Sequence, residues 1–506
     1  MEKKNSFSSG LGFILATAGS SVGLGNLWSF PYKTSQNGGA AFVIVYILSV
    51  LLLGLALSVA EIYIGKRSKA NNVTAFKKTH KNLWWIGLVT ILGTLMIAFY
   101  YAVIGGYTIK YTVSSFSSNP IDLKAFSGNT WEVILYSGIF LALTILIISF
   151  GVKRGIEKAS KILMPALIVI LIGIVIYCLC LGSGVKEGLN FYLNPDFKAL
   201  GAKGILNAMA QAFFSMSIGC GTLCAYGSYT GKEIRIGKCA VWVAVFDTAV
   251  ALLAGLAIFP AIYHYKAETG IDLDNSGIVL LFSSMPVIFS KLGVAGMIVS
   301  FLFFGMVAIA AVTSLVSLIE VIAQYLIQRF HLKRKKACVF IALFVFAVSI
   351  PVGMSLGYSL NEQNVMVIGN LNFLEILDQI VTTIFIPLSA LFIALCVGWF
   401  MFPTKNKKDF FNFRYLSKKL EEEGLSLGKF SNVFAFLIKY VAPLFILVID
   451  IIGLVDRIFP SSRFELGGLL VVLTGVALIG ILIGVYFLFL KNKDTGDNAI
   501  EDSLKN

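Results

Sequence analysis

The chain is dominated by long runs of apolar residues that short polar loops separate. Twelve of these runs reach or approach the ~20 residues that a helix needs to cross a bilayer. They cover residues 11–36, 40–65, 86–115, 132–150, 161–182, 204–230, 239–264, 293–329, 337–360, 371–402, 433–456 and 467–490. The pattern predicts an all-α polytopic membrane protein with twelve transmembrane helices. The first run lacks the cleavage pattern of a signal peptide, so we expect it to stay in the mature protein.

Two of the twelve runs are interrupted by closely similar phrases. Residues 21–26 read Ser-Val-Gly-Leu-Gly-Asn in the first run, and residues 217–222 read Ser-Ile-Gly-Cys-Gly-Thr in the sixth. Glycine and small polar residues weaken a helix, and irregular backbone inside a bilayer is tolerated only beside a cavity. Paired interruptions in the two halves of a chain indicate the binding site of a transporter, near the bilayer midplane.

Composition agrees with the membrane prediction, because 57% of the residues are hydrophobic and only 13% are charged. Charged residues make up roughly 25% of ordinary soluble domains. The net charge of +14 comes from basic residues in alternate loops, around residues 66–81, 153–158, 232–238, 329–336 and 405–414. This is the pattern of cytoplasmic loops, so we expect a multi-pass protein of the cell membrane with both termini in the cytoplasm. The same pattern accounts for the positive charge without a nucleic-acid partner.

Catalytic and metal-binding motifs are not evident in the sequence. The seven cysteines and three histidines lack the spacing of a zinc site, and we expect no structural disulfides. There is no phosphate-binding loop, no His-Glu-x-x-His motif and no convincing pair of nucleophile and base. An enzyme is therefore not predicted.

The two interruptions divide the chain into two five-helix repeats. We expect a cytoplasmic N-terminal tail at 1–10, repeats at 11–182 and 183–402, a cytoplasmic loop at 403–432, two peripheral helices at 433–490 and a cytoplasmic tail at 491–506. Because each repeat has an odd number of helices, the second is inverted relative to the first. Broken helices 1 and 6 would then offer helix N-termini to a carboxylate and free carbonyls to a cation. The two peripheral helices are candidates for a homodimer contact.

Several motifs together carry a family resemblance. They lie at residues 19–32, 37–42, 154–158, 190–197, 211–219 and 310–314. In this order they closely resemble the signature of the neurotransmitter:sodium symporter family, whose bacterial members include sodium-dependent amino-acid transporters with the leucine-transporter fold. The resemblance spans most of the chain, and it implies sodium-coupled uptake of an amino acid by alternating access.

The resemblance also implies two sodium sites. The first ion is expected at the Ser21 carbonyl, the Asn26 side chain, Ser215 and Asp247. The second is expected among the carbonyls of Gly19, Val22 and Ala310 and the hydroxyls of Thr313 and Ser314. Oxygen ligands of this kind suit a hard cation. The alternative for serine and threonine in membrane helices is a hydrogen bond to their own backbone or to a neighbouring helix.

The substrate is expected between the two interruptions. The resemblance implies that it is bound by Ser20, Ser21, Leu24, Gly25, Ile97, Tyr101, Phe214, Ser215, Ser217, Cys220, Ser314 and Leu318. The amides of Leu24 and Gly25 and the hydroxyl of Tyr101 would hold its carboxylate. The remaining lining is largely apolar, which favours a neutral hydrophobic or aromatic amino acid.

Asp247 is an ionisable residue inside a predicted span, which costs ~2.5 kcal/mol or more at the centre of a membrane helix. Many similar family members have asparagine here, and the chloride-dependent ones bind chloride nearby. A fixed carboxylate would supply that charge, so we expect sodium coupling with no chloride requirement. The alternative is a protonated Asp247 that is hydrogen-bonded in the core.

The chain departs from the family pattern at both gates. Ser29 stands where the outer gate usually has an arginine, whose acidic partner is matched by Asp378. Lys33 lies one turn beyond Ser29, so Lys33 and Asp378 are the gate candidates. At the other end of the path, Gln328 stands where an aspartate would form an ion pair.

Two other classes of function stay open at this point. One is a proton-coupled amino-acid permease with the same repeat, in which Asp247 or Glu320 would carry the proton. The other is an amino-acid sensor on a transporter scaffold, which would bind its ligand without moving it.

Overall fold

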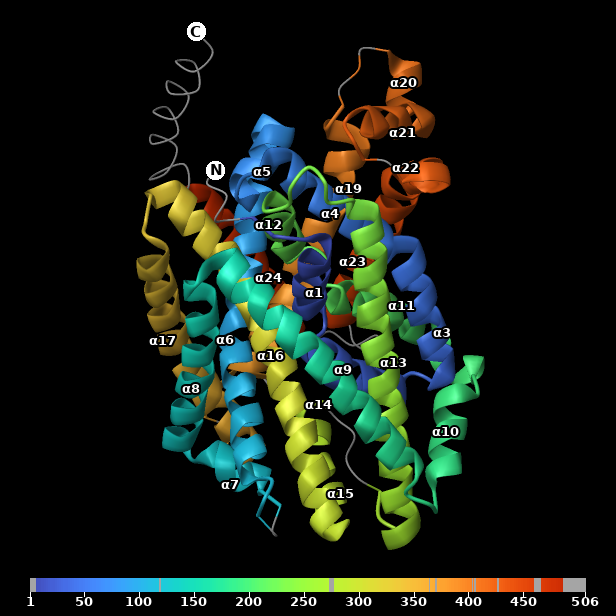
Figure 1. Cartoon of the computed structure of the whole chain (residues 1–506), viewed down its shortest axis with the longest axis vertical. Coiled ribbons are helices and arrows are strands. Elements are labelled where there is room, and N and C mark those ends of the chain that lie inside the picture. The colour runs from blue at the N-terminus through green and yellow to red at the C-terminus, as the bar shows by residue number, and fades with distance from the viewer. Residues whose placement is uncertain are drawn as a thin grey trace.

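The computed structural model describes residues 6–117, 120–272, 277–363, 365–368, 371–402, 404, 406–425, 427–458 and 466–485. These residues form an elongated bundle of long helices (Figure 1). Nine of the described helices are long and apolar enough to cross a membrane, and the bent first pair makes a tenth. The sixth predicted span consists of two shorter helices instead. The exact number of twelve spans and the inverted repeat remain predictions.

The first half of the chain contains the following helices. They are α1 (Gly10–Ser21), η2 (Gly25–Ser29), α2 (Phe30–Gln36), α3 (Ala40–Ser49), η3 (Val50–Gly54), α4 (Leu55–Ser68), α5 (Asn72–Thr79), η4 (Lys81–Leu83), α6 (Trp84–Ser114), α7 (Leu123–Gly128), α8 (Thr130–Ser149), η5 (Val152–Glu157) and α9 (Lys158–Leu179). Most ends lie within a few residues of the predicted spans. The largest difference is at η5, which begins the fifth span at 152 and not at 161.

The second half contains further long helices and one small hairpin. Its helices up to residue 400 are α10 (Val185–Leu193), α11 (Phe197–Ser215), α12 (Thr222–Ser228), α13 (Ile236–Thr269), α14 (Gly277–Val279), η6 (Leu280–Ser284), α15 (Met285–Ser290), α16 (Gly293–Phe330), α17 (Arg334–Leu360), α18 (Phe373–Ile380), η7 (Val381–Phe385), α19 (Ile386–Leu395) and η8 (Cys396–Phe400). The strands β1 (Val367–Ile368) and β2 (Leu371–Asn372) pair antiparallel.

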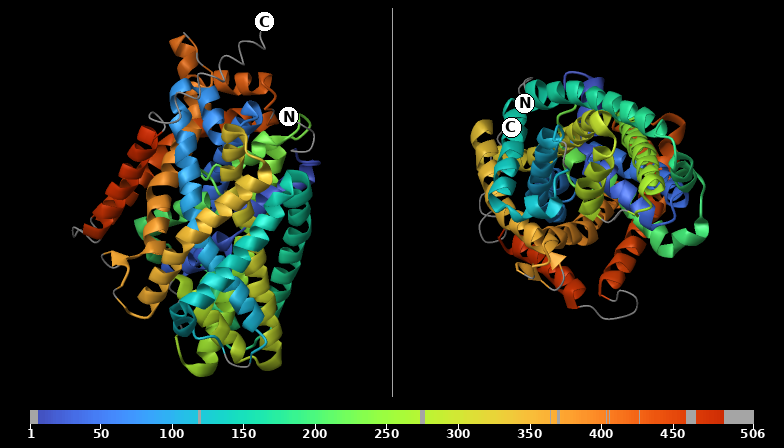
Figure 2. Two further views of the ribbon diagram at one scale, coloured as in Figure 1. Left: turned by 90° about the vertical axis from the view of Figure 1, so that its left-hand side faces the viewer. Right: turned by 90° about the horizontal axis from the view of Figure 1, so that it is seen from below.

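The remaining helices follow residue 400. They are α20 (Lys407–Phe411), α21 (Phe413–Glu422), η9 (Gly428–Phe430), α22 (Ser431–Phe436), η10 (Leu437–Val441), α23 (Ala442–Ile458) and α24 (Leu466–Val485). The loop expected at 403–432 thus holds the short helices α20, α21 and η9, which are too short and too polar to stand out as apolar runs. The tail expected at 491–506 lies outside the described residues, as do the first five residues. Figure 2 shows α24, in red, at the periphery of the bundle.

Both interruptions appear as breaks in the helices. α1 ends at Ser21, and the two halves of the first span meet at an angle of 51°. The sixth span stops at Ser215 and resumes at Thr222 as α12. Between them, Gly219 and Gly221 have φ values of +78° and +76°. Left-handed backbone of this kind favours glycine, which accounts for the two glycines in this phrase. Ser217 adopts it as well, with a φ value of +55°.

The interrupted helices lie inside the bundle, and other helices surround them. α6 packs along α16, and α12 packs against α4. The outer helices α8, α9 and α17 expose large apolar side chains, such as Leu143, Val169 and Leu343. Such exposure is what a lipid-facing helix requires, because the bilayer interior is itself apolar.

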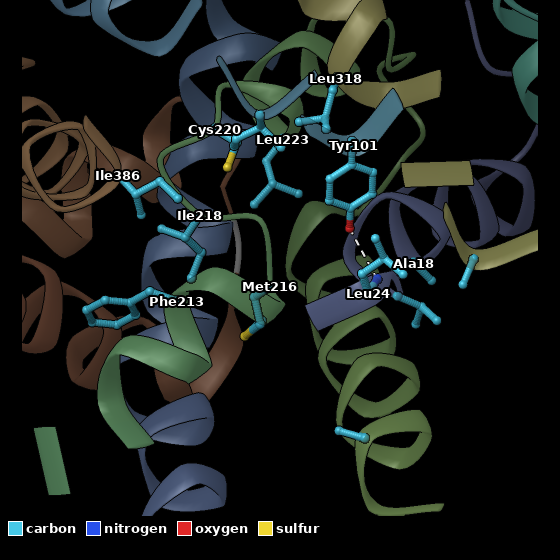
Figure 3. Packing of buried hydrophobic residues seen from close by; sticks show 14 of the residues in the cluster. Ala18, Leu24, Tyr101, Phe213, Met216, Ile218, Cys220, Leu223, Leu318 and Ile386 are labelled. Carbon is cyan, nitrogen blue, oxygen red and sulfur yellow. Dashed lines mark hydrogen bonds between the residues drawn. The ribbon is translucent and has the colours of Figure 1, made fainter. Parts of the chain in front are cut away.

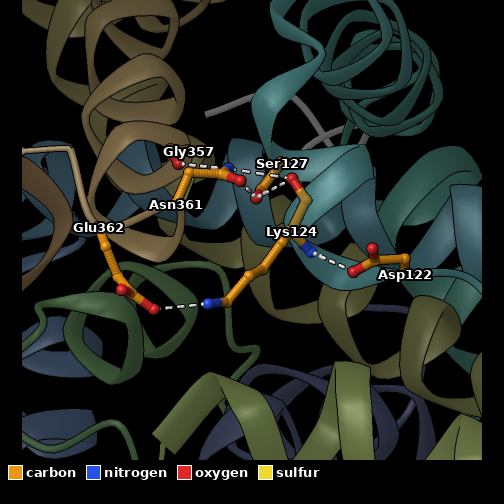
Figure 4. A network of polar contacts seen from close by, with 6 residues as sticks. All are labelled: Asp122, Lys124, Ser127, Gly357, Asn361 and Glu362. Atoms are coloured by element: carbon orange, nitrogen blue, oxygen red, sulfur yellow. Dashed lines mark hydrogen bonds and ion pairs between the residues drawn. The ribbon is translucent and has the colours of Figure 1, made fainter.

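A polar network closes the end of the bundle opposite the N-terminus (Figure 4). There, the Lys124 ammonium on α7 contacts the Glu362 carboxylate, which follows α17, at 2.7 Å. Asn361 donates hydrogen bonds to the carbonyls of Lys124 (3.0 Å) and Gly357 (2.9 Å). The hydrogen bond from Lys124 lowers the pKa of the Glu362 carboxyl. These contacts hold the short helix α7 against the end of α17.

Candidate functional site

A small cavity lies between the two breaks. Its lining consists of Ser20, Ser21, Gly25, Ile97, Tyr101, Phe214, Ser217, Cys220, Ser314 and Leu318. All ten are among the twelve residues that the sequence predicts around the substrate. The free space is about 30 Å³, enough for one or two water molecules. An amino acid would therefore fit only if the surrounding side chains moved apart.

The two remaining predicted residues, Leu24 and Ser215, are not among the residues that line the cavity. The amide of Leu24 donates to the hydroxyl of the lining residue Tyr101 at 3.1 Å (Figure 3). The hydroxyl of Ser217 donates to the Ser20 carbonyl at 3.0 Å. Polar groups from both broken helices thus meet at one place.

A first oxygen cluster surrounds Asp247, which is fully buried on α13. Its Oδ1 accepts from Asn26 Nδ2 at 2.8 Å, and its Oδ2 accepts from Ser215 Oγ at 2.7 Å. The hydroxyl of Tyr46 lies 3.3 Å from Oδ2. These contacts bring together the three side chains predicted at the first sodium. The hydroxyl of Ser21, whose carbonyl belongs to the same prediction, donates to the Met216 carbonyl at 3.4 Å.

A second oxygen cluster joins α16 to the end of α1. The hydroxyl of Ser314 lies 3.4 Å from the Gly19 carbonyl and 3.3 Å from the carbonyls of Ser20 and Val22. Carbonyls at the end of a helix lack the amide partners that the next turn would supply, so they are free for other ligands. Thr313 donates to the Ala310 carbonyl of its own helix at 3.1 Å. This is the alternative named above for serine and threonine in membrane helices, a hydrogen bond to their own backbone.

Gly23 lies between the cavity and the second cluster. A Cβ atom at this position would collide with the hydroxyls of Ser314 and Tyr101. The residue must therefore be glycine for α1, α6 and α16 to approach this closely.

Three buried polar residues that the sequence did not predict as part of the site hold the second break. Glu61 Oε2 accepts from the Gly219 amide at 2.9 Å, and Thr94 Oγ1 donates to the Cys220 carbonyl at 2.5 Å. Asn72 Nδ2 donates to the Gly221 carbonyl at 3.1 Å. Glu61 could have been identified from the sequence, since a carboxylate within an apolar run is costly and requires a partner. No sequence feature distinguished Asn72, because it lies in a loop between predicted spans.

The gate residues make hydrogen bonds. Asp378 Oδ1 accepts from the hydroxyl of Tyr100 at 3.0 Å, and Ser29 donates to Gln211 Oε1 at 2.9 Å. The pairing of Lys33 with Asp378 stays a prediction. At the N-terminal end of the bundle, Gln328 Oε1 accepts from both the amide and the side-chain nitrogen of Asn71.

A buried ion pair lies near that same end. Glu320 on α16 is fully buried and is bridged to the guanidinium of Arg334. The hydroxyl of Tyr229 donates to Glu320 Oε1 at 2.8 Å. In the alternative of a proton-coupled permease, Glu320 would carry the proton. An ion pair with Arg334 requires the ionised carboxylate, which disfavours that role.

A larger cavity lies elsewhere, between the ends of α6 and α16. Its lining includes Tyr111, Ser300 and Phe304 but no charged side chain. Among the described residues, neither of the two interrupted spans contributes to this lining, and no carboxylate lies there for an ion or a zwitterion. The chemistry therefore favours the smaller cavity as the functional site.

Comparison with known proteins identifies the family of the chain. A model of the sodium:neurotransmitter symporter family matches residues 4–124 and 121–465. The chain is 32% identical over 476 residues to YhdH of Bacillus subtilis, described as an uncharacterized sodium-dependent transporter, which covers 90% of this chain and 99% of YhdH. It is 26% identical over 397 residues to sodium-dependent nutrient amino acid transporter 1 of Drosophila mojavensis, over 65% of this chain and 61% of that protein.

A solved structure resembles the whole bundle. The crystal structure of MhsT in complex with L-phenylalanine shares 35% sequence identity with this chain and superposes with a TM-score of 0.77. The match covers 89% of this chain and 99% of MhsT. The matched family consists of membrane transporters and not of enzymes. With its two helix breaks and the match over nearly its whole length, the chain belongs to the sodium:neurotransmitter symporter family.

Proposed function

We propose that this protein couples the inward movement of sodium to the uptake of a neutral, hydrophobic or aromatic amino acid by alternating access. The observation that supports this most directly is the pair of oxygen clusters, around Asp247 and around Ser314, both of which include residues of the first helix break. The relative solved with L-phenylalanine supports an amino acid as the substrate.

Two sodium ions would bind at the two clusters. The cluster at Asp247 offers a carboxylate and neutral oxygens, and the cluster at Ser314 offers carbonyls of α1 and a hydroxyl. Each charge that crosses the membrane gains ~2.3 kcal/mol per 100 mV. Two ions would gain ~4.6 kcal/mol, and since ~1.4 kcal/mol is a tenfold ratio, accumulation of roughly a thousandfold becomes possible.

Asp247 would make transport independent of chloride. Its carboxylate is fixed by Asn26, Ser215 and Tyr46 beside the first sodium site. A permanent negative charge there neutralises the cation without a bound anion. Neutralising Asp247 should therefore create a need for chloride.

The cavity lining favours an uncharged substrate side chain. None of its ten residues is charged, and Ile97, Phe214 and Leu318 form apolar walls. A charged substrate side chain would be buried without a partner, which is costly. Cys220 is small and leaves room for a bulky side chain, so L-phenylalanine is a suitable first probe.

The end of the bundle that carries α5, α12 and α20–α22 would face the cytoplasm of the cell. The basic loops at 66–81 and 329–336 flank this end, as expected for cytoplasmic loops. Both termini would lie on this side of the plasma membrane. The peripheral helices α23 and α24 would be the contact in a homodimer.

The proposal is tested by uptake of labelled L-phenylalanine into proteoliposomes under an inward sodium gradient. We expect accumulation with sodium chloride and with sodium gluconate, and none with potassium chloride. Asp247→Asn should abolish uptake in gluconate. Asp450→Asn is the matched control, because Asp450 is also an acidic residue in an apolar helix but lies on the peripheral α23.

Each alternative outcome points to a different function. Uptake that follows a proton gradient and ignores sodium would replace the proposal with a proton-coupled permease. Binding of L-phenylalanine without uptake would indicate a sensor. Loss of wild-type uptake in gluconate would overturn chloride independence alone.

A further inference from the structure

The short helix α5 connects the second helix break to α16. Its first residue, Asn72, is 1% exposed. The side-chain nitrogen of Asn72 donates to the Gly221 carbonyl and to Thr90 Oγ1, both at 3.1 Å. Because Gly221 has φ +76°, a residue with a side chain would be strained there. A Cβ atom at Gly221 would also collide with Asn72 Nδ2, so helix and break are in close contact.

The other side of this connection is Asn71, which precedes α5. Its amide and its side-chain nitrogen both donate to Gln328 Oε1, at 2.7 and 2.9 Å. Its side-chain oxygen accepts from the Thr74 amide at 3.1 Å and so caps the helix. One asparagine therefore both starts α5 and fastens it to α16.

Both partners of α5 lead directly to the cavity. Gly221 follows Cys220, whose side chain lines the cavity and whose carbonyl is held by Thr94. On α16, Gln328 lies ten residues beyond Leu318, which is another lining residue. At 1.5 Å per residue this is about 15 Å along the helix axis. Through these two contacts, α5 connects the cavity wall at Cys220 with a point on α16 well outside the cavity.

These bonds are buried or partly buried, so they resist being broken. A buried donor that loses its acceptor costs about 1–3 kcal/mol, and three of the four bonds end on atoms of the break or of Gln328. Movement of the segment around Cys220 would therefore either break the bond from Asn72 to Gly221 or draw α5 along with it. Through Asn71, such a movement would reach α16.

We propose that α5 is a strut that couples occupancy of the cavity to closure of the N-terminal end of the bundle, with Asn72 as the positioning residue for the segment that carries Cys220. The coupling rests on the proposed function, because it requires a substrate in the cavity. It assigns to a loop helix a role in linking the two events that alternating access must join.

Hydrogen exchange measured by mass spectrometry tests the strut on the full-length protein in detergent. Exchange of the wild-type protein is measured in sodium alone and in sodium plus saturating L-phenylalanine. The same two measurements are made on four variants: Asn72→Ala, Gln328→Ala, Gln328→Glu and Thr79→Ala. We expect the substrate to slow exchange in both α12 and α5 of the wild-type protein. In Asn72→Ala the slowing in α12 should persist at higher substrate concentration, while the slowing in α5 disappears.

The other variants separate coupling from a general loss of structure. Gln328→Ala should abolish the substrate-dependent slowing in the last turns of α16 but keep it in α5, whereas Gln328→Glu retains the acceptor oxygen and should behave as wild type. Thr79→Ala removes only a bond within α5 and should change nothing. We also expect Asn72→Ala to raise the Kd for L-phenylalanine about tenfold.

Two results would overturn the strut. One is slowing in α5 that survives in Asn72→Ala, and the other is a wild-type protein that binds and transports L-phenylalanine with no change in α5. A third result would also overturn it: faster exchange of α5 in Asn72→Ala that does not depend on substrate would show a merely structural role. Failure of the wild-type protein to bind any neutral amino acid would instead overturn the proposed function.

Discussion

The hydroxyl of Tyr100 donates to Asp378 Oδ1 at 3.0 Å and thereby joins α6 to α18. The next residue, Tyr101, lines the cavity. The contact between α6 and α18 is thus made by the residue next in sequence to one that lines the proposed substrate site. We expect that opening the cavity toward α18 would break this hydrogen bond.

Tyr100→Phe removes the donor and leaves the aromatic ring. A hydrogen bond to a charged group contributes about 1.5–3 kcal/mol, so we expect bound L-phenylalanine to dissociate at least tenfold faster. The measurement is the release of labelled substrate from detergent-solubilised protein. Tyr111→Phe is the control, because Tyr111 lies on the same helix and its buried hydroxyl has no partner among the described residues. Equal release rates in Tyr100→Phe and wild type would contradict this role.

Ser314→Ala should weaken sodium binding more than it weakens substrate binding. The variant removes the hydroxyl that faces three carbonyls of α1 and leaves the apolar wall of the cavity. We expect the sodium concentration for half-maximal uptake to rise about tenfold, and the maximal rate at saturating sodium to change much less. Ser349→Ala, which removes only a bond within α17, should change neither of these two quantities. A change in maximal rate alone would argue against a cation at this cluster.

Glu320→Gln should destabilise the protein strongly. It leaves the guanidinium of Arg334, which is 19% exposed, without its carboxylate partner. Breaking a buried ion pair costs about 3–5 kcal/mol, and we expect a clear fall in thermal stability in detergent. The double variant with Arg334→Met should recover much of the loss, because no unpaired charge is then buried. A double variant less stable than Glu320→Gln would contradict this account.

Cys220 should make transport sensitive to thiol reagents. Its side chain lines the cavity, so modification by a methanethiosulfonate would fill the space that the substrate needs. We expect uptake to fall in the wild-type protein, sodium with L-phenylalanine to protect it, and Cys220→Ser to resist the reagent. Cys180→Ser is the control, since Cys180 is exposed away from the cavity. Inhibition that persists in Cys220→Ser would place the sensitive thiol elsewhere.

The sequence was most informative where function depends on local motifs. The phrases at 21–26 and 217–222 predicted both breaks, because glycine weakens a helix and each phrase combines two glycines with small polar residues. The motif residues Asn26, Ser215 and Asp247 come from three segments, and the structure brings them within hydrogen-bonding distance. Their role as sodium ligands stays a prediction.

Contacts between helices were much less accessible to sequence analysis. Tyr100 and Asp378, like Glu320 and Arg334, are paired through the packing of helices whose neighbours no periodicity reveals. The short helix α5 was also missed. Its eight residues are too few and too polar to stand out as an apolar run, and its importance depends on where Asn71 and Asn72 reach.

Gly23 has room for a hydrogen atom and nothing larger, because the hydroxyls of Tyr101 and Ser314 occupy the space beside it. One added methyl group would press on a wall of the cavity and on the second oxygen cluster at the same time. A genetic screen for lost uptake should therefore recover changes at Gly23 as often as changes at the charged Asp247. Such a screen would show that one substitution can damage two sites at once, at a residue that has no side chain to bind either ligand.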